Sequence, residues 1–255
     1  MKNIKLLIQY DGTNYAGWQR QKDERTIQGV IEDVIKRVTG ENLRLIPSGR
    51  TDAGVHALGQ VANFKTVSKP LHQNLWCEGK IEGKRWKDII NASLPEDIKI
   101  LDSAEVDMDF HARYSARGRL YSYTILNQED PITILRNYVW HIRRNLNVEA
   151  MIEAGRFLTG EHDFSSFRAS ACTARKTARK IAELRIEKRR SFIVITIEAN
   201  AFLHHMVRNI VGTLVEVGRG RLSPDAVREI LSAKDRNLAG PTAPARGLIL
   251  MGVKY

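Results

Sequence analysis

SGRTDAGVHALGQVANFK (48–65) joins a loop rich in turn-forming residues to a segment in which apolar and polar residues alternate. The pattern of GQVANFK (59–65), and that of LRLIP (43–47), predicts two strands, so the RTDAG loop lies between them. Loops held by rigid strands often carry catalytic groups. The sequence therefore draws attention to Asp52, the one carboxylate of this stretch.

Asp52 is open to two interpretations. Asp-Ala-Gly is typical of a turn, because an Asp side chain can accept a hydrogen bond from its own backbone two residues on. Arg50, two residues away, would instead keep the carboxylate ionised, and an ionised, partly desolvated aspartate can serve as a nucleophile or a base. Taken alone, the pattern is more typical of the turn.

The rest of the first half follows the same mixed pattern. IKLLIQY (4–10) alternates and predicts a strand. TIQGVIEDVIKRVTG (26–40) has apolar residues at helical spacing, with Thr26 as the N-cap and Gly40 as the C-terminal stop. Residues 68–86 show no sustained period and are predicted to be a surface excursion.

The second half repeats this mixture of strands and helices. Its expected strands are RLYSYTI (119–125), a basic hairpin made of RKIAELRIEK (179–188) and SFIVITIEA (191–199), and GLILMGVKY (247–255). Its expected helices are VEAMIEAGRFLTG (148–160) after Asn147, the buried FLHHMVRNIVGTLVEVG (202–218), and SPDAVREILSA (223–233) with Ser223 as N-cap and Pro224 at the first helical position.

These elements predict an α/β protein of the α+β type, with a mainly antiparallel sheet and helices on one face. Charge and pattern both shift near residue 107, which divides the chain into an N-terminal domain (1–106) that carries the RTDAG loop and a basic C-terminal domain (107–255). Apolar residues make up 43% and charged residues 27%, as in ordinary globular proteins rather than disordered ones.

Positive charge is concentrated in the second domain. Of the net charge of +11, residues 107–255 contribute +9, with 24 Lys and Arg against 15 Asp and Glu. Eight basic and two acidic residues fall within 175–190. Such a surface attracts a polyanion through phosphate contacts and counterion release, although a solvated strand face would have the same composition. Charge alone leaves both interpretations open.

Several other kinds of site lack support in the sequence. The nucleotide-binding strings GxxxxGK[ST] and GxGxxG and the hydrolase string GxSxG are absent, so we expect no cofactor. Cys77 and Cys172 are far apart and His204 and His205 are adjacent, and neither spacing is typical of a metal site. We also expect no membrane span, no signal peptide and a cytoplasmic location with free thiols.

GRTDAGVHALGQV (49–61) closely resembles the active-site motif of the bacterial tRNA pseudouridine synthase A family. The resemblance extends nearly end to end, in the family's order, through five further strings: YDGTNYAGWQRQ (10–21), FHARYSARGRLYSY (110–123), DFSSFRA (163–169), EANAFLHHMVRNIVGTLVEVG (198–218) and PARGLIL (244–250). Six ordered strings are far more specific than one motif. One departure is Asn63, where the family often has His.

The resemblance implies roles for particular residues. Asp52 matches the family's catalytic aspartate, and Arg50 matches an arginine proposed to help displace the target base. Tyr121 matches a tyrosine that contacts the target uridine, Arg208 an arginine that faces the aspartate, and Leu248 a leucine expected to line the base pocket.

The resemblance also implies a reaction, a partner and a fold. Family members isomerise uridine to pseudouridine at positions 38, 39 and 40 of the tRNA anticodon stem-loop. They need no cofactor or metal and act as homodimers whose subunits share the tRNA. Their fold is two ferredoxin-like halves joined through a central antiparallel sheet.

Physical chemistry is compatible with these roles without requiring them. Arg208 lies in an apolar helical pattern, where it either pairs with a carboxylate such as Asp52 or extends to the surface. Tyr121 is either sheet packing or a face on which an extruded base stacks. Phosphate contacts from Arg175, Lys176, Arg179 and Lys180 would help offset the cost of flipping a base.

Three hypotheses follow. The first is the tRNA-modifying isomerase, in which Asp52 is the nucleophile or the base. The second is a non-catalytic RNA-binding or RNA-folding module on the same scaffold. The third is an aspartate-dependent nucleoside hydrolase, which would release free uracil.

Overall fold

The computed structural model describes residues 1–67, 85–170, 172 and 174–255, and the chain divides into two compact units. The first unit comprises Met1–Ala116 and Leu250–Tyr255, and the second comprises Arg117–Ile249. Most of the surface excursion expected at 68–86 lies outside the described residues.

The first unit has the chain order of a ferredoxin-like half. Its elements are β1 (Lys2–Tyr10), α1 (Ile27–Thr39), β2 (Ile46–Pro47), β3 (His56–Thr66), α2 (Trp86–Asn91) and β4 (Ile98–Val106). The strands pair antiparallel in the spatial order β4–β1–β3–β2. A βαββαβ chain with this strand order is the ferredoxin-like arrangement.

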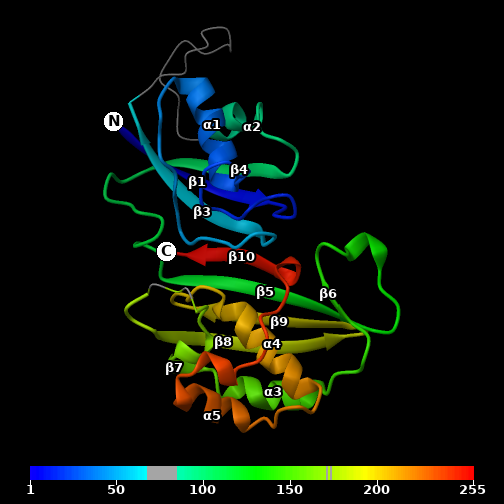
Figure 1. Ribbon diagram of the computed structural model, residues 1–255. Helices are drawn as coiled ribbons and strands as arrows, with labels where there is room; N and C mark the ends of the chain where they lie inside the picture. Colours follow the sequence, from blue (N-terminus) through cyan, green and yellow to red (C-terminus); the bar gives the residue numbers. More distant parts are fainter. Residues whose placement is uncertain (68–84, 171, 173) are drawn as a thin grey trace. The chain divides into compact units, whose positions relative to one another are not determined.

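One face of this sheet is covered by α1 and α2 (Figure 1). Alternate residues of β1, namely Ile4, Leu6 and Ile8, are fully buried, whereas Lys5 and Leu7 between them are less so. This alternation is what a strand with one covered face requires. The helix α1 begins where expected, because the Thr26 side chain accepts a hydrogen bond from the Gly29 amide.

The second unit contains β5 (Gly118–Asn127), β6 (Trp140–Ile142), α3 (Val148–Arg156), β7 (Gly160–Asp163), β8 (Ala178–Arg189), β9 (Phe192–Ala199), α4 (Met206–Gly218) and α5 (Ala226–Ala233). Its strands run in the order β5–β9–β8–β7 with antiparallel pairing, and β6 pairs parallel with β5. The strand β10 (Leu248–Lys254) begins in this unit and ends in the first.

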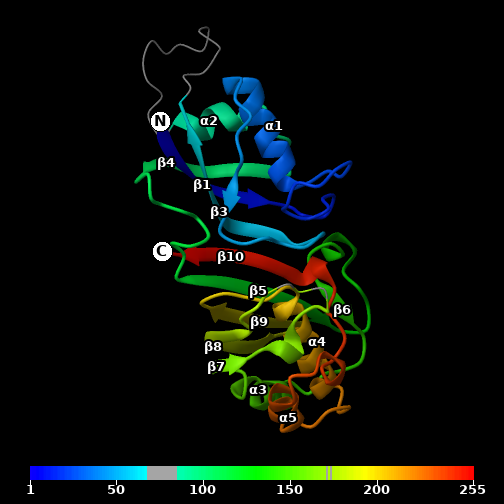
Figure 2. The same cartoon turned by 60° about the vertical axis from the view of Figure 1, so that its left-hand side comes forward.

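Helices α3, α4 and α5 gather on one side of the sheet of the second unit (Figures 1 and 2). Gly155 of α3 lies so close to β8 that a Cβ there would be 2.9 Å from Leu184 Cδ2. Gly218 at the end of α4 packs in the same way on Met151 of α3. The expected mixed α/β class, with mainly antiparallel strands and helices on one face, is confirmed.

Several element boundaries differ from the sequence-based expectation. The helix expected over 202–218 begins only at Met206, because His205 before it adopts a left-handed conformation with a φ of 61°. The LRLIP strand is only the two residues of β2, and α3 ends at Arg156, before the expected Gly160. The helix expected from Ser223 begins at Ala226, because Pro224 and Asp225 form a turn. Ser223 still acts locally, since its Oγ accepts a hydrogen bond from the Ala226 amide.

Candidate functional site

In the first unit, the loop that carries Asp52 is held by the backbone and side chain of Thr51. Thr51 is buried, and its Oγ1 lies 2.7 Å from the hydroxyl of Tyr10 in β1. The Thr51 carbonyl accepts a hydrogen bond from the Trp18 amide at 3.0 Å. Asp52 itself is half-buried, and its carbonyl accepts from the Val55 amide at 3.2 Å. The turn anticipated at Asp-Ala-Gly therefore exists, although it is closed through the backbone.

Arg50 lies at the exposed end of an ordered segment. The Ser48 amide donates to the Val61 carbonyl at 2.7 Å, and the Ser48 hydroxyl donates to Gln60 Oε1 at 2.7 Å. The Gln60 side chain in turn donates to the Gly49 carbonyl at 2.9 Å. The backbone is thus fixed up to the residue before Arg50, whose side chain is exposed.

A second loop of the first unit, residues 11–18, packs on the Asp52 loop. The Gly12 amide donates to His56 Nδ1 at 3.1 Å, and the Gly54 amide donates to the Tyr15 carbonyl at 3.4 Å. His56 is buried beside these bonds. Burial raises the pKa of the Tyr10 phenol to about 12, so this hydroxyl is neutral at physiological pH. These supporting residues were not among those picked from the sequence, although both loops were.

Asn63, the departure noted in the sequence, has a structural role in the first unit. It is buried, and its side chain donates to Asn3 Oδ1 at 2.9 Å and accepts from the Ala112 amide at 2.9 Å. Asn3 donates to the Phe110 carbonyl at 2.9 Å. The two asparagines thereby attach the FHAR segment (110–113) to β1 and β3.

In the second unit, Tyr121 lies in the middle of β5, opposite Ile197 of β9. It is 8% exposed, and its ring meets the edge of the Phe202 ring with centroids 5.1 Å apart. The rotation of the Tyr121 side chain is therefore restricted by packing on an aromatic neighbour.

Arg208 lies in the first turns of α4 and is half-buried. Its Nε donates to the Ala243 carbonyl at 2.7 Å, and its own carbonyl accepts from the Ala243 amide at 3.1 Å. The guanidinium is thus directed by the backbone of residue 243. This contact is neither of the two arrangements weighed from the sequence, a carboxylate pair or an extension to the surface, and it leaves both open.

Asn209 and Thr213 fasten the segment around Ala243 along the same helix. Asn209 Oδ1 accepts from the Thr242 hydroxyl at 2.7 Å, and Thr213 Oγ1 accepts from the Gly240 amide at 2.9 Å. Asn209 Nδ2 also donates to the Phe167 carbonyl at 2.8 Å. These residues were not singled out from the sequence; the feature that could have indicated them is the presence of polar residues inside an otherwise apolar helix, which does not identify their partners.

Leu248 follows a segment fixed to β5. The Tyr123 hydroxyl donates to the Pro244 carbonyl at 2.8 Å, and a Cβ on Gly247 would lie 2.6 Å from the Tyr123 ring. Leu248 is buried at the start of β10. The positions of Tyr121, Arg208 and Leu248 are thus each defined by contacts within the second unit.

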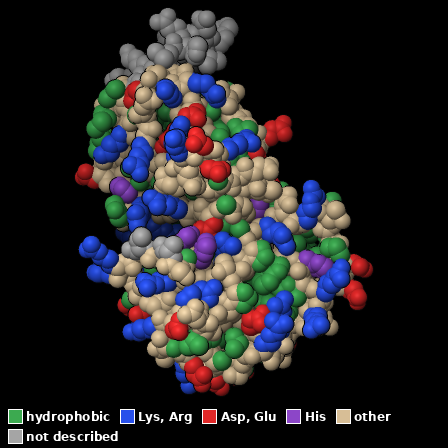
Figure 3. Space-filling model, in the orientation of Figure 1, with side chains coloured by type: hydrophobic (Ala, Val, Ile, Leu, Met, Phe, Trp, Pro, Cys, Tyr) green, Lys and Arg blue, Asp and Glu red, His purple; other side chains and the backbone are tan. Residues whose placement is uncertain are grey.

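The four basic residues expected to contact phosphate lie at or before the start of β8. Arg175, Lys176 and Lys180 are exposed. Arg179 differs, because its Nη1 donates to the carbonyls of Lys176 and Ala178, and burial lowers its pKa. Figure 3 shows Lys and Arg side chains spread over the visible face of this unit.

Within either unit taken by itself, the described residues include no group of three His, Cys, Asp or Glu side chains placed to share a metal ion. In the described part of the chain, none of the helices is long and apolar enough to cross a membrane.

Known proteins are similar to this chain over its whole length. A sequence model for the family described as tRNA pseudouridine synthase matches residues 6–115 and 154–255. A chain called tRNA pseudouridine synthase A from Thermoanaerobacter sp. (strain X514) is 48% identical over 255 residues, the full length of both chains. One of the same name from Acetivibrio thermocellus, and one called tRNA pseudouridine synthase A 2 from Clostridium perfringens, are each 46% identical over the same full lengths.

Proposed function

Because this chain belongs to the tRNA pseudouridine synthase family, we propose that it isomerises uridine to pseudouridine at positions 38, 39 and 40 of the tRNA anticodon stem-loop. The observation that carries the reaction and its substrate class is the full-length similarity, at 46–48% identity, to proteins of that name. The three positions rest on the motifs that resemble those of the A group within the family.

Asp52 is the group to which the proposal assigns the chemistry. The bond between N1 of uracil and C1′ of ribose breaks, the uracil turns, and C5 bonds to C1′; the hydrogen on C5 is released as N1 gains one. A carboxylate can begin this exchange by attacking C1′ or by removing a proton from the sugar. A half-buried aspartate next to a buried, hydrogen-bonded Thr51 suits either role, because its backbone does not have to reorganise.

Four further residues would act beside Asp52, three on the base and one on the carboxylate. The exposed Arg50 would help to displace the uridine from its stack, and Tyr121 would offer its ring to the extruded uracil. Arg208 would pair with the carboxylate of Asp52, and Leu248 would line the base pocket. Support comes from the ordered surroundings of Arg208 and Leu248, since positioned groups contribute more to catalysis than mobile ones.

The proposal extends to binding, assembly and location. Arg175, Lys176, Arg179 and Lys180 would contact tRNA phosphates, and the exposure of three of them is compatible with that role. The protein would act as a homodimer whose subunits share one tRNA, as the resemblance implies. A tRNA substrate and cysteines without a disulfide pattern favour a cytoplasmic location.

The test uses tRNA transcripts labelled with tritium at C5 of uridine. The protein should release tritium to water, and carbodiimide adducts should stop reverse transcription at positions 38, 39 or 40 of suitable transcripts. Asp52→Ala and Asp52→Asn should lose tritium release by at least about 10³-fold, in the range of other essential catalytic groups, while binding of the transcript is retained.

The other hypotheses give different outcomes in the same assay. A non-catalytic RNA-binding module would bind the transcript, and neither the wild-type protein nor the Asp52 variants would release tritium from it. A nucleoside hydrolase would liberate free uracil, which chromatography of the product detects. Adduct stops outside the anticodon stem-loop would contradict the assigned positions while leaving the reaction intact.

A further inference from the structure

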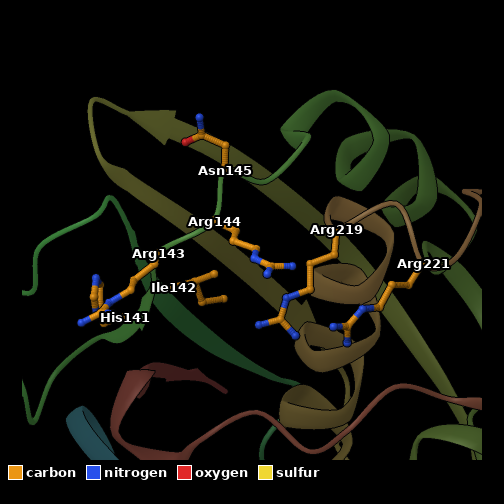
Figure 4. A pocket seen from close by; sticks show the side chains of 7 residues that line it. All are labelled: His141, Ile142, Arg143, Arg144, Asn145, Arg219 and Arg221. Carbon is orange, nitrogen blue, oxygen red and sulfur yellow. The ribbon is translucent and has the colours of Figure 1, made fainter.

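The second unit holds a cavity of about 470 Å³ that is lined mainly by arginines (Figure 4). One side is formed by β6 and the connection that follows it, and the other by the turn that follows α4. The lining residues are His141, Ile142, Arg143, Arg144, Asn145, Arg219 and Arg221. None of them has a role in the function proposed above.

Three of the guanidinium groups converge. In Figure 4 the side chains of Arg144, Arg219 and Arg221 point toward the same space, whereas His141 and Arg143 lie at the other end of the cavity. Arg219 Nη1 lies 2.7 Å from Glu216 Oε1, and Arg221 Nη1 lies 3.0 Å from Glu216 Oε2. Glu216 therefore pairs with two of the three arginines, and the three guanidinium groups together with this carboxylate carry a summed charge of +2.

The backbone that presents Arg144 is fixed by hydrogen bonds from the buried side chain of Asn127. Asn127 of β5 is buried, and its amide donates to the carbonyls of Ile142 at 2.9 Å and Arg144 at 2.8 Å. Asn127 Oδ1 accepts from the Leu146 amide at 3.1 Å. A single buried side chain thus holds the bend of this connection at three points.

The turn that presents Arg219 and Arg221 is fixed as well. The Arg221 amide donates to the Glu216 carbonyl at 3.0 Å, and Gly220 adopts a φ of 72° that favours glycine. The Glu216 side chain is only 11% exposed, and it pairs with the less exposed Arg219 (28%) as well as with the more exposed Arg221 (64%). Both sides of the cavity therefore present their arginines on ordered backbone.

Converging like charges disfavour the free protein, and a bound anion would reverse that effect. Guanidinium groups pair with phosphate oxygens in two parallel hydrogen bonds, which a lysine cluster could not reproduce. Arg221 is 64% exposed along its side chain, so the site opens to solvent and suits a group that is part of a long chain rather than an enclosed small molecule. These features together favour the phosphodiester backbone of RNA.

We propose that Arg144, Arg219 and Arg221 form a phosphate-binding site for the backbone of the tRNA substrate, in addition to the residues assigned to the uridine. This inference rests on the proposed function for the identity of the RNA. The site would position the substrate without touching the reacting base, so its loss should raise KM and leave kcat nearly unchanged.

The test is a double variant, Arg144→Gln with Arg221→Gln, which retains the Arg219–Glu216 pair. Its control is Lys36→Gln with Arg37→Gln, which removes two exposed positive charges from the last turn of α1. Binding of a full-length tRNA transcript is measured by filter retention between about 50 and 300 mM salt, and circular dichroism shows that both variants are folded.

We expect the cavity variant to bind tRNA roughly tenfold more weakly and to lower the slope of log Kd against log salt by about 1 to 2, since each phosphate contact contributes about 0.7 to 0.9. Equal losses in the control variant would show a net-charge effect and overturn the proposal. Unchanged tRNA binding, or saturation of the site by millimolar inorganic phosphate without competition against tRNA, would overturn it too.

These outcomes separate the inference from the proposed function. Filter retention needs no turnover, so a protein that binds tRNA through these arginines but forms no pseudouridine would refute the reaction and keep the site. Conversely, a variant with full tRNA affinity, wild-type KM and normal tritium release would refute the site and keep the reaction.

Discussion

Gly12 and Gly17 allow the loop of residues 11–18 to lie directly against the loop that carries Asp52. A Cβ on Gly12 would lie 2.0 Å from the Val55 carbonyl oxygen, and one on Gly17 would lie 2.7 Å from the Thr51 carbonyl oxygen. Gly17 also has a φ of +92°, which other residues rarely adopt. The strings YDGTNYAGW and GRTDAGV are therefore in direct backbone contact, and glycine at these two positions permits it.

We expect Gly12→Ala to separate these two loops. No flexible side chain can move aside, because the clashing atoms are backbone, so the substitution should cost about 1–3 kcal/mol of stability, as overpacking typically does. Tritium release should fall with it, because the Asp52 loop is displaced. Gly252→Ala is the matched control, since nothing lies within 4 Å of its added Cβ. Equal urea midpoints for the two variants would contradict this account.

At the scale of the element, α1 shows how far local signals suffice. Thr26 and Gly40 were identified from the sequence as its two ends, and both act as caps in the structure. Gly40 has a φ of 76°, and its amide donates to the Lys36 carbonyl at 2.8 Å. Capping depends on residues close in sequence, which is why the pattern predicts it.

Thr26→Ala should destabilise the protein by about 1 kcal/mol, in the range of 0.5–2 kcal/mol for lost N-caps. The Gly29 amide, which is buried, would lose its acceptor. Thr26→Ser keeps the hydroxyl and should recover most of the difference. Equilibrium urea unfolding measures both, and an alanine variant as stable as the serine variant would show that the cap contributes nothing.

The helix α4 shows where local signals fail. Its apolar pattern predicted a buried helix, and it is buried along nearly its whole length. The pattern did not reveal that Asn209 and Thr213 fasten residues 240–243 to the helix, nor that Gly212 lies against Pro241. Those partners are about 30 residues away, and their approach is decided by tertiary packing. The late start of α5 has a local cause, because Pro224 and Asp225, which precede the helix, form a turn.

At the scale of the whole molecule, the fold class and the family were predictable because six strings spread along the chain agree in order. The position of Asp52 on a loop between β2 and β3 was predictable from the strand patterns of the segments on either side of it. The cavity around Arg144 was not, because Arg144 and Arg219 are 75 positions apart and only the folded chain brings them to one space. Motif strings thus point to single residues, whereas a cavity lined by side chains from distant, motif-free segments needs the folded chain to be found.

Acid should weaken the folded protein through Asp163. Burial of this carboxyl opposes its ionisation, but hydrogen bonds from Ser165, Thr177 and Lys234 outweigh burial and lower its pKa to about 2, from 3.8. Because the folded pKa is lower than the unfolded one, the resulting stability is fully present above about pH 4 and is lost as the pH falls toward 2.

Asp163→Asn should therefore be less stable than the wild type at pH 6, and the difference between them should shrink between pH 4 and pH 2.5. Urea midpoints across this range provide the measurement. Asp225→Asn is a control, because this exposed carboxylate lies 4.0 Å from Arg228, at the limit of an ion pair. A difference that stays constant down to pH 2.5 would show that ionisation of Asp163 does not contribute.

The first unit is discontinuous in sequence, and this affects its biosynthesis. Tyr255 donates to the Ala112 carbonyl at 2.9 Å and packs on Phe110, while Gly59 lies against Met251, so residues 250–255 are integral to this unit. During translation the ribosome makes these residues only after the entire second unit. The aspartate loop thus leaves the ribosome early, but the first unit that holds it can be completed only after residues 250–255 have left the exit tunnel.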